Sequence, residues 1–324
     1  MTTKVLVSDR LPKSSVDRLR ATPGVDVVEK TGLSEEQLLP LVADVEGWLV
    51  RGETKVTRRL LEAAPKLRWV GRAGAGLDNV DVSAAKERGV EVMNVPGGNS
   101  IAVAELVLGL LLALFRRIPE ADASMRRGEW LKSRLMGREL RGKTIGIVGM
   151  GKIGREVARR AAAFEMKPIG YDPLVPPDAI RAGGAEPVTL DALLATSDVV
   201  SLHVPSTPET KKMFDAARIA SMKPGAVIVN AARGNLIDTG ALLEALRSGH
   251  LAGAALDVFE AEPPPPQPLF ELPQVVLSPH LGASTREAQE AVGDEIVRLL
   301  LERIAGAGAA RAAGGAGAPD AART

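Results

Sequence analysis

The sequence predicts an α/β protein built from two parallel-sheet domains. Short apolar runs alternate with helical stretches along most of the chain, and this alternation is typical of parallel sheets covered by helices on both faces. The 324 residues are enough for two domains with cores of their own. A glycine-rich turn near the middle of the chain begins a second α/β unit, so one complete unit precedes it.

The first unit is predicted to occupy residues 1 to about 97. Its expected strands are Lys4–Ser8, Val25–Glu29, Gly47–Val50, Arg68–Val70 and Val90–Val95. The helical patterns between them are Ser14–Ala21, Ser34–Leu41, Thr57–Ala64 and Val82–Arg88. Because short loops join these strands and helices, the strands are expected to lie parallel in one sheet.

A long apolar helix is predicted from Ser100 to about Arg117. It is apolar around most of its circumference, so it is expected to be buried on several sides, between domains or between subunits. Its apolar run contains Glu105 and is too short to span a bilayer. The composition of the next segment, Met125–Leu140, does not assign it a structure.

The second unit is predicted to run from Lys143 to about His280. Its expected strands are Thr144–Val148, Pro168–Tyr171, Val199–Val204, Ala226–Asn230, Ala254–Val258 and Val275–Leu277. The expected helices are Arg155–Phe164, Leu190–Ala195, Ala216–Ser221, Gly240–Ser248 and a last one, Thr285–Ile304. Residues 305–324 are mostly Ala and Gly with no apolar period, so disorder or a frayed helix is expected there.

The glycine-rich turn has the spacing of a dinucleotide-binding turn. Gly149 permits a tight turn after the strand, Gly151 lets the backbone approach a pyrophosphate, and Gly154 lets the next helix pack closely on the strand. The first N–H groups of that helix then point at the phosphate. A lone glycine motif is weak evidence, so the prediction depends on the elements around it.

An acidic residue stands at the expected distance from the turn. Asp172 ends the strand Pro168–Tyr171 and comes 21 residues after Gly151, where a carboxylate can bind both ribose hydroxyls of an adenosine. The alternative is an aspartate that only starts the loop before Pro173. The carboxylate would repel a 2′-phosphate, and no basic residue follows until Arg181, so NAD is favoured over NADP.

Composition excludes several classes of protein. Hydrophobic residues make up 45% and charged residues 25%, as in ordinary globular proteins. The formal net charge of +1 gives no support to nucleic-acid binding. The absence of cysteine excludes disulfides, thiolate catalysis and Cys-ligated metal sites, and no metal is expected. No secretory signal and no membrane span are expected, which predicts a cytoplasmic protein.

Acid–base candidates are few, because the chain has three histidines. His280 follows the strand Val275–Leu277 and comes 18 residues after Glu262. A carboxylate beside an imidazole fixes its tautomer and stabilises its protonated form, so the pair suits proton exchange with a substrate oxygen. A histidine at a strand end is more often structural, and Glu260 competes with Glu262 for the role. His203 closes a strand beside the predicted cofactor crevice, whereas His250 follows a helix and is expected to be solvated.

Two further polar residues follow strands of the second unit. Arg233 comes after Ala226–Asn230, where an open parallel sheet binds ligands, and a guanidinium there can bind a substrate carboxylate. The alternative for Arg233 is a surface salt bridge. Asp257 lies among apolar residues near a strand end, so it is expected to have a specific partner.

The sequence resembles the D-isomer-specific 2-hydroxyacid dehydrogenases over about residues 4 to 304. The segments that carry the resemblance are Gly71–Asp81, Val92–Ser100, Ala104–Glu105, Gly142–Gly154, Leu256–Phe259 and Pro279–Thr285. The resemblance implies a Rossmann-type NAD domain, residues 98–281, inserted into a discontinuous flavodoxin-like substrate domain of residues 1–97 and 282–304. Residues 305–324 would be a disordered tail, and the family's usual C-terminal strand is replaced by this Ala/Gly-rich sequence.

The resemblance also implies roles for individual residues. The catalytic residues would be Arg233, Glu262 and His280, so the resemblance favours Glu262 over Glu260. The cofactor would be held by Gly149, Gly151, Lys152, Ile153, Gly154, Asp172, His203, Val204, Pro205, Ala231, Ala232, Arg233, Asp257, His280, Gly282 and Ala283. The substrate would contact Arg51, Arg72, Gly74, Ala75, Arg233 and His280.

The implied activity is NAD-dependent oxidation of a 2-hydroxy acid. The narrower resemblance is to members that oxidise 3-phosphoglycerate to 3-phosphooxypyruvate at the start of serine synthesis, in homodimers or homotetramers. A neighbouring subunit would then supply Lys132 and Arg134 to the substrate. One alternative is a reductase of glyoxylate, hydroxypyruvate or another 2-keto acid, and a remote one is an NAD(H)-responsive binding protein similar to the family's co-repressors.

Overall fold

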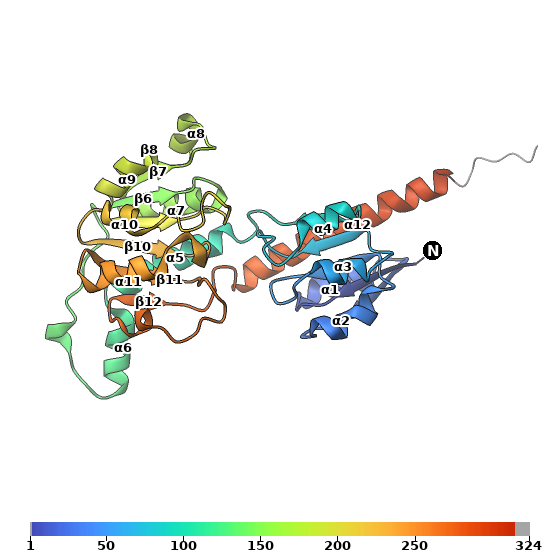
Figure 1. Cartoon of the computed structure of the whole chain (residues 1–324), viewed down its shortest axis with the longest axis horizontal. Helices are drawn as coiled ribbons and strands as arrows, with labels where there is room; N and C mark the ends of the chain where they lie inside the picture. Colours follow the sequence, from blue (N-terminus) through green and yellow to red (C-terminus); the bar gives the residue numbers. More distant parts are fainter. Residues whose placement is uncertain (1, 315–324) are drawn as a thin grey trace, which may run out of the picture. The chain divides into compact units, whose positions relative to one another are not determined.

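The computed structural model describes residues 2–314. The chain forms two compact units: the first contains the residues up to Asn99 and those from Arg286 onward, and the second contains Ser100–Thr285. Each unit has a single parallel sheet with helices packed on it (Figure 1). This confirms the predicted α/β class with two parallel sheets.

The sheet of the first unit has the strand order β2-β1-β3-β4-β5. Its strands are β1 (Thr3–Val7), β2 (Val25–Glu29), β3 (Gly47–Val50), β4 (Trp69–Arg72) and β5 (Glu91–Asn94). Each of the strands predicted for this unit therefore forms, within a residue or two of its expected bounds. All neighbours pair in parallel, so the carboxyl ends of the strands share one edge of the sheet.

Helices cover both faces of this first sheet. On one face, α1 (Lys13–Arg20) and α12 (Arg286–Gly314) pack on a core that contains Val5 and Val7. On the other face, α2 (Glu35–Val42), α3 (Arg58–Glu62) and α4 (Val82–Glu87) pack on a core that contains Leu6. Successive strand residues point to opposite faces, so an uninterrupted apolar strand fills both cores.

Helix α12 is longer than the sequence predicted. It continues to Gly314 and includes residues 305–314, where disorder or a frayed helix was expected, so these residues are helical rather than disordered. Alanine is the strongest helix former, and extending a packed helix costs less than nucleating a new one. The rest of the predicted tail, residues 315–324, lies outside the described residues.

The sheet of the second unit has the strand order β12-β11-β10-β9-β6-β7-β8. Its strands are β6 (Thr144–Val148), β7 (Lys167–Tyr171), β8 (Glu186–Pro187), β9 (Val199–Leu202), β10 (Ala226–Asn230), β11 (Leu251–Leu256) and β12 (Val275–Leu277). The chain order reverses at β6, which pairs with β7 on one side and β9 on the other. Ligands of open parallel sheets bind beyond the strand ends at such a reversal.

Helices also cover both faces of the second sheet. One face carries α5 (Ser100–Phe115), α7 (Lys152–Ala163) and α8 (Pro177–Ala182). The other face carries α9 (Leu190–Thr196), α10 (Ala216–Ala220) and α11 (Thr239–Arg247). Helix α6 (Ile118–Arg126) and the short 3-10 turns complete the unit; the turns are η1 (Lys132–Arg134), η2 (Gly234–Leu236) and η3 (Pro268–Glu271).

Several bounds in the second unit differ from the prediction. Strand β9 ends at Leu202 rather than Val204, and β11 runs from Leu251 to Leu256, so Asp257 follows the strand. Strand β11 starts early because its first residues pair with β10 across a register shift. The apolar helix α5 packs on α7 and the sheet of its own unit, which accounts for its buried residues there.

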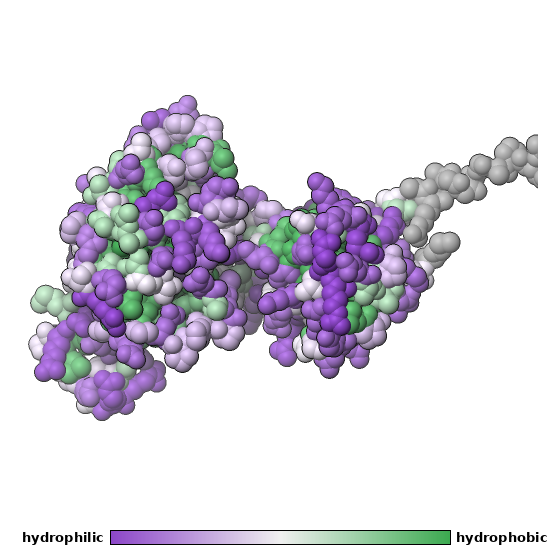
Figure 2. Space-filling view, viewed as in Figure 1, coloured by the Kyte–Doolittle hydropathy of each residue, from purple (hydrophilic) through white to green (hydrophobic). Residues whose placement is uncertain are grey.

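The face of the protein in Figure 2 is mostly hydrophilic, with separate apolar areas. Large apolar side chains that remain exposed in the second unit include Ile118, Met125, Trp130 and Met136. These lie on α6 and in the segment after it. Within residues 2–314, no helix combines the length and the apolar character that a membrane span requires.

Candidate active site

The glycine turn joins β6 to α7 at the carboxyl edge of the second sheet. Gly149 has a φ of +99°, and a Cβ there would lie 2.6 Å from the carbonyl oxygen of His203. A Cβ on Gly154 would lie 2.0 Å from the carbonyl oxygen of Gly149. Real Cβ atoms do not approach this closely, so both positions require glycine to let the turn, the helix and the neighbouring loop pack.

The middle of the turn is open to a ligand. A Cβ on Gly151 would meet no atom within 4 Å, and α7 begins directly after it with Lys152 and Ile153. The first N–H groups of a helix have no partner within the helix, so this end can bind a phosphate. The Asp172 carboxylate lies at the same turn, because its Oδ2 accepts the Met150 N–H at 2.9 Å. These residues fit a dinucleotide.

Asp172 also holds the loop that follows it. Its Oδ1 accepts the N–H of Leu174 at 2.9 Å. The two roles predicted for this residue, a ribose ligand and the start of a loop, are therefore compatible, since each oxygen of a carboxylate accepts more than one hydrogen bond.

His203 follows β9 beside the glycine turn. Its Nε2 lies 2.8 Å from Ser201 Oγ, and its buried Nδ1 has no hydrogen-bond partner among the described residues. Burial lowers the pKa of His203 to about 3, so the ring is neutral near pH 7. The next residue, Val204, packs against the turn, since its Cγ1 would lie 3.0 Å from a Cβ on Gly149. Pro205 follows Val204, and its carbonyl oxygen accepts a hydrogen bond from the Thr210 hydroxyl.

His280 and Glu262 form a hydrogen-bonded pair. The distance between His280 Nδ1 and Glu262 Oε2 is 2.7 Å, and the two side chains are 51% and 38% exposed. The other oxygen of Glu262 accepts the N–H of Phe259 at 3.1 Å, which fixes the carboxylate. His280 has a φ of +54°, and its N–H donates to the carbonyl oxygen of Asp257 at 2.8 Å. The partly exposed His280 ring is therefore held by Glu262, and its backbone is held by Asp257.

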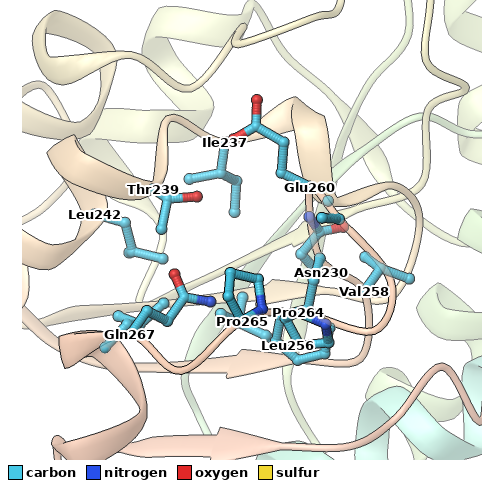
Figure 3. Close-up of a pocket in the computed structure, with 14 residues that line it drawn as sticks. Asn230, Ile237, Thr239, Leu242, Leu256, Val258, Glu260, Pro264, Pro265 and Gln267 are labelled. Carbon is cyan, nitrogen blue, oxygen red and sulfur yellow. The ribbon is translucent and has the colours of Figure 1, made fainter.

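The structure distinguishes Glu262 from Glu260, which sequence spacing alone could not do. Glu262 faces His280, whereas Glu260 lines a pocket of about 300 Å³ (Figure 3). That pocket has a largely apolar lining and also contains Thr239 and Gln267. Of these two glutamates, Glu262 is therefore the one that is hydrogen-bonded to the histidine ring.

Asp257 is fully buried and holds the turn that carries His280. Its Oδ1 accepts Ser278 Oγ at 2.6 Å and the N–H of Leu281 at 2.7 Å, and its Oδ2 accepts the N–H of Gly282 at 2.9 Å. These contacts supply the specific partners that a buried carboxylate requires. Ala283 follows in the same loop.

Arg233 lies in the loop after β10, close to the loop that carries Glu262. The buried Asn230 closes the Arg233 loop, because its Oδ1 accepts the Ala232 N–H and its Nδ2 donates to the Arg233 carbonyl oxygen. Ala231 begins this loop. A Cβ on Gly234 would lie 1.9 Å from the carbonyl carbon of Phe259, so the loops after β10 and β11 touch. This packing brings Arg233, Asp257 and Glu262 to one edge of the sheet.

The candidate substrate residues of the first unit lie at the carboxyl ends of β3 and β4. Arg51 directly follows β3, and Arg72 is the last residue of the neighbouring strand β4. The Arg72 guanidinium lies over Gly74, where a Cβ would fall 1.5 Å from Nη1, and it also lies near Gly52. Ala75 is held by its carbonyl oxygen, which accepts Asn94 Nδ2 at 2.6 Å. Two cations and a glycine-rich backbone therefore share this edge.

Lys132 and Arg134 lie in the exposed turn η1 of the second unit. The carbonyl oxygen of Arg134 accepts Nη1 of Arg117, which ties the turn to the start of α6. Whether these two cations reach a substrate in a neighbouring subunit stays a prediction.

Three residues of these sites were not singled out in the sequence. Asn230 and Ser278 fix the loops of the second unit, and Asp9 fixes the loop after β3 in the first. Each is a polar residue that ends a strand or follows one within two positions, at the sheet edge where parallel folds bind ligands. That pattern is the signal that could have found them.

Residues 108–282 match the model of the NAD-binding domain of the D-isomer-specific 2-hydroxyacid dehydrogenases. The chain belongs to this family. The matched segment includes the glycine turn, Asp172, the Arg233 loop and the His280 turn, and the match confirms the prediction of NAD as the cofactor.

The chain is also similar to curated proteins named D-3-phosphoglycerate dehydrogenase. The protein of Rattus norvegicus is 46% identical over 94% of this chain and 57% of its own length. The protein of Methanocaldococcus jannaschii is 47% identical over 94% of this chain and 58% of its own length. The chain thus spans somewhat more than half the length of these relatives.

Among solved structures, a glyoxylate reductase from Paecilomyes thermophila has the same fold. Its TM-score is 0.86 at 34% identity, and the match covers 94% of this chain and 95% of that one. The two-unit architecture is therefore shared with a protein that is named for a different activity.

Proposed function

We propose that the protein catalyses the NAD-dependent oxidation of 3-phosphoglycerate to 3-phosphooxypyruvate, the first step of serine synthesis. The observation that carries a dehydrogenase role is the His280–Glu262 pair beside the Arg233 loop, in the unit that contains the dinucleotide turn. The choice of substrate is supported by the relatives named D-3-phosphoglycerate dehydrogenase.

In this proposal, His280 takes the proton of the substrate hydroxyl. A carboxylate only accepts hydrogen bonds, so the 2.7 Å contact with Glu262 places the ring hydrogen on Nδ1. The Nε2 of the neutral ring is then a free acceptor for the hydroxyl proton. As the imidazolium forms, the Glu262 carboxylate stabilises its positive charge.

Arg233 would bind the substrate carboxylate and polarise the carbonyl that forms at C2. Its guanidinium already donates to the carbonyl oxygen of Ala232 at 2.6 Å, which directs part of the side chain along its own loop. When bound, NAD accepts the hydride from C2. The chain supplies the orientation and the electrostatic stabilisation.

Arg51 and Arg72 would bind the charged groups of the substrate in the first unit. A phosphorylated hydroxy acid carries a phosphate and a carboxylate, and guanidinium groups bind both in a bidentate manner. The Arg51 side chain makes no hydrogen bond or ion pair with another described residue and is partly buried, so its guanidinium remains available for an anion.

A steady-state assay of NADH formation tests the proposal. With 3-phosphoglycerate, kcat/KM is expected to exceed the values for D-lactate, D-glycerate and D-malate by at least about 10²-fold, because an unphosphorylated substrate leaves the Arg51 guanidinium without an anion to bind. The variant Arg51→Ala is expected to raise the KM for 3-phosphoglycerate far more than the KM for D-glycerate. Equal effects on both substrates would remove Arg51 from the phosphate site.

A reductase of glyoxylate or hydroxypyruvate is the second candidate. The likeness to a glyoxylate reductase over nearly the whole chain favours it. The same enzyme preparation assayed for NADH consumption with glyoxylate and hydroxypyruvate decides between them. A higher kcat/KM for either keto acid than for 3-phosphooxypyruvate would overturn the first proposal.

We also propose that the protein forms a homodimer or homotetramer. The exposed side chains of Trp130 and Met136, at 76% and 87%, support this because Trp and Met are among the residue types enriched at protein–protein interfaces. Light scattering after size-exclusion chromatography measures the mass. A monomer at micromolar concentration would contradict the proposal.

A further inference from the structure

Asp9 is a buried carboxylate at the carboxyl edge of the first sheet. It comes two residues after β1 and is 1% exposed. Its partners lie in the loop after the neighbouring strand β3: Oδ2 accepts the Arg51 N–H at 2.6 Å, and Oδ1 accepts the Thr54 N–H at 3.0 Å. The Thr54 hydroxyl donates to the same carboxylate. All these partners are neutral groups of the residue 51–54 loop.

A second residue holds the same loop from the other side. Asn79 Nδ2 donates to the carbonyl oxygen of Arg51 at 3.0 Å and to that of Thr54 at 2.7 Å. Asp9 therefore binds the N–H groups, and Asn79 binds the carbonyl groups, of the first and last residues of the loop. Both ends of the segment that begins with Arg51 are fixed.

The hydrogen-bond network of Asp9 and Thr54 continues into the core of the first sheet. Ser8 Oγ lies 3.0 Å from Thr54 Oγ1 and accepts the indole N–H of the fully buried Trp48 at 2.8 Å. Ser8, Asp9 and Thr54 are each almost excluded from solvent. A fully satisfied network of buried polar groups fixes one backbone arrangement, because any other would leave a group without its partner.

We propose that Asp9 is a positioning residue that orients Arg51 for binding the anionic group of the substrate. The inference rests on the proposed function. Asp9 makes no ion pair with any described residue, and its hydrogen bonds go to backbone N–H groups and a hydroxyl. Its charge is therefore satisfied without neutralising the Arg51 guanidinium, which stays available while its backbone is held.

The variant Asp9→Asn keeps the shape of the side chain but replaces one acceptor oxygen with a donor. That NH₂ group would face an N–H group of the loop, so the loop loses its fixed arrangement. The expected result is a rise of about tenfold in the KM for 3-phosphoglycerate with kcat and the Kd of NADH unchanged. In an Arg51→Ala background, Asp9→Asn is expected to add no further change in KM, because the two residues act on one contact.

The variant Asn79→Ala loosens the same loop from its other side and tests the inference if Asp9→Asn does not fold. It is expected to raise the same KM, again only when Arg51 is present. Asp44→Asn is the matched control, since Asp44 is an exposed aspartate of the same unit that pairs with Lys4 and Lys66. Asp44→Asn is expected to leave the KM unchanged.

The outcomes separate this inference from the proposed function. If Arg51→Ala raises the KM but neither Asp9→Asn nor Asn79→Ala does, Asp9 has no positioning role. If Asp9→Asn raises the KM equally with and without Arg51, it acts on the fold of the unit, and the inference is also wrong. If Arg51→Ala itself leaves every KM unchanged, the assignment of Arg51 in the proposed function fails instead.

Discussion

Asp9 in the first unit and Asp257 in the second are the two charged residues among residues 2–314 whose side chains are almost excluded from solvent. Each follows a parallel strand and accepts hydrogen bonds from the loop after the neighbouring strand. Each also accepts a hydroxyl of that loop, from Thr54 or from Ser278. Two sheets of different size thus use the same arrangement at their carboxyl edges.

The loops that these aspartates hold carry different chemistry. The Asp9 loop presents Arg51, a permanent cation whose side chain has no partner among the described residues. The Asp257 loop presents His280, which pairs with Glu262. A buried carboxylate is costly unless it is fully hydrogen-bonded, so each one fixes its loop. Under the proposed function, the Asp9 loop would therefore present a cation to the substrate, and the Asp257 loop would present the group that exchanges the proton.

The largest expected effect is on proton transfer in the second unit. His280→Ala is expected to lower kcat by about 10³-fold, because the hydroxyl proton loses its acceptor. The Kd of NADH, measured by fluorescence titration, is expected to change little. His250→Ala is the matched control, since the His250 side chain is hydrogen-bonded to the carbonyl oxygen of Ile219 and belongs to neither the Glu262 loop nor the His280 turn. Turnover that survives in His280→Ala would remove the acid–base role from this unit.

Acid is expected to weaken the second unit through His203, which lies within Ser100–Thr285. Burial holds the pKa of His203 at about 3, whereas an unfolded histidine titrates near pH 6.5. Below pH 6.5 the unfolded chain binds a proton that the folded chain does not, so stability falls until the folded pKa is reached.

The variant His203→Gln removes this titration. Relative to the variant, the wild type is expected to lose about 3 kcal/mol of unfolding free energy between pH 7 and pH 4, at about 1.4 kcal/mol per pH unit below 6.5. Urea unfolding of both proteins across this range measures the difference. Parallel pH profiles would show that His203 does not titrate differently in the folded state.

The variant Asp257→Asn sharpens the contrast between the two aspartates. An asparagine keeps only one of the two acceptor oxygens, so the N–H of either Leu281 or Gly282 faces an NH₂ group and the His280 turn shifts. At saturating NAD, kcat is expected to fall by up to about 10²-fold, with a smaller change in the KM of the substrate. Asp9→Asn is expected to show the reverse pattern. If both variants changed only KM, the two loops would not differ in function.

The smallest expected effect is on the cation beside Arg51. A methyl group at Gly74 would collide with Arg72 Nη1, whereas one at Gly52 would stay 4.0 Å from Nη2. Gly74→Ala is therefore expected to displace the guanidinium and raise the KM for 3-phosphoglycerate about tenfold. Gly52→Ala is the matched control and is expected to leave the KM unchanged. Equal KM values for the two variants would exclude Arg72 from the anion site.

Much of the fold could be predicted from local sequence. The strands from β1 to β5 and the turn at Gly149 follow from apolar runs and glycine spacing, which are properties of adjacent residues. The length of α12 could not be predicted, because Ala/Gly-rich sequence has no apolar period and its helix continues from a packed one. The start of β11 depends on pairing with β10 and was also missed.

The candidate site was predictable only in part. Polar residues after parallel strands mark the sheet edge, so Arg233, Asp172 and His280 could be found from their positions. The choice between Glu260 and Glu262 could not be made from spacing, because both follow the same strand in an irregular loop. Their side chains point to different places, and only Glu262 reaches His280.

The sequence by itself determined the two parallel sheets, the dinucleotide turn and the strand ends where chemistry is placed, because periodicity and glycine spacing act over short distances. Only the tertiary structure decided which polar groups meet. Asp9 and Arg51 are 42 residues apart and touch because β1 and β3 pair. Asp257 reaches Gly282, 25 residues away, because β11 and β12 pair. Strand pairing joins residues that are far apart in the sequence, and it fixes the loops that present Arg51 in one unit and His280 in the other.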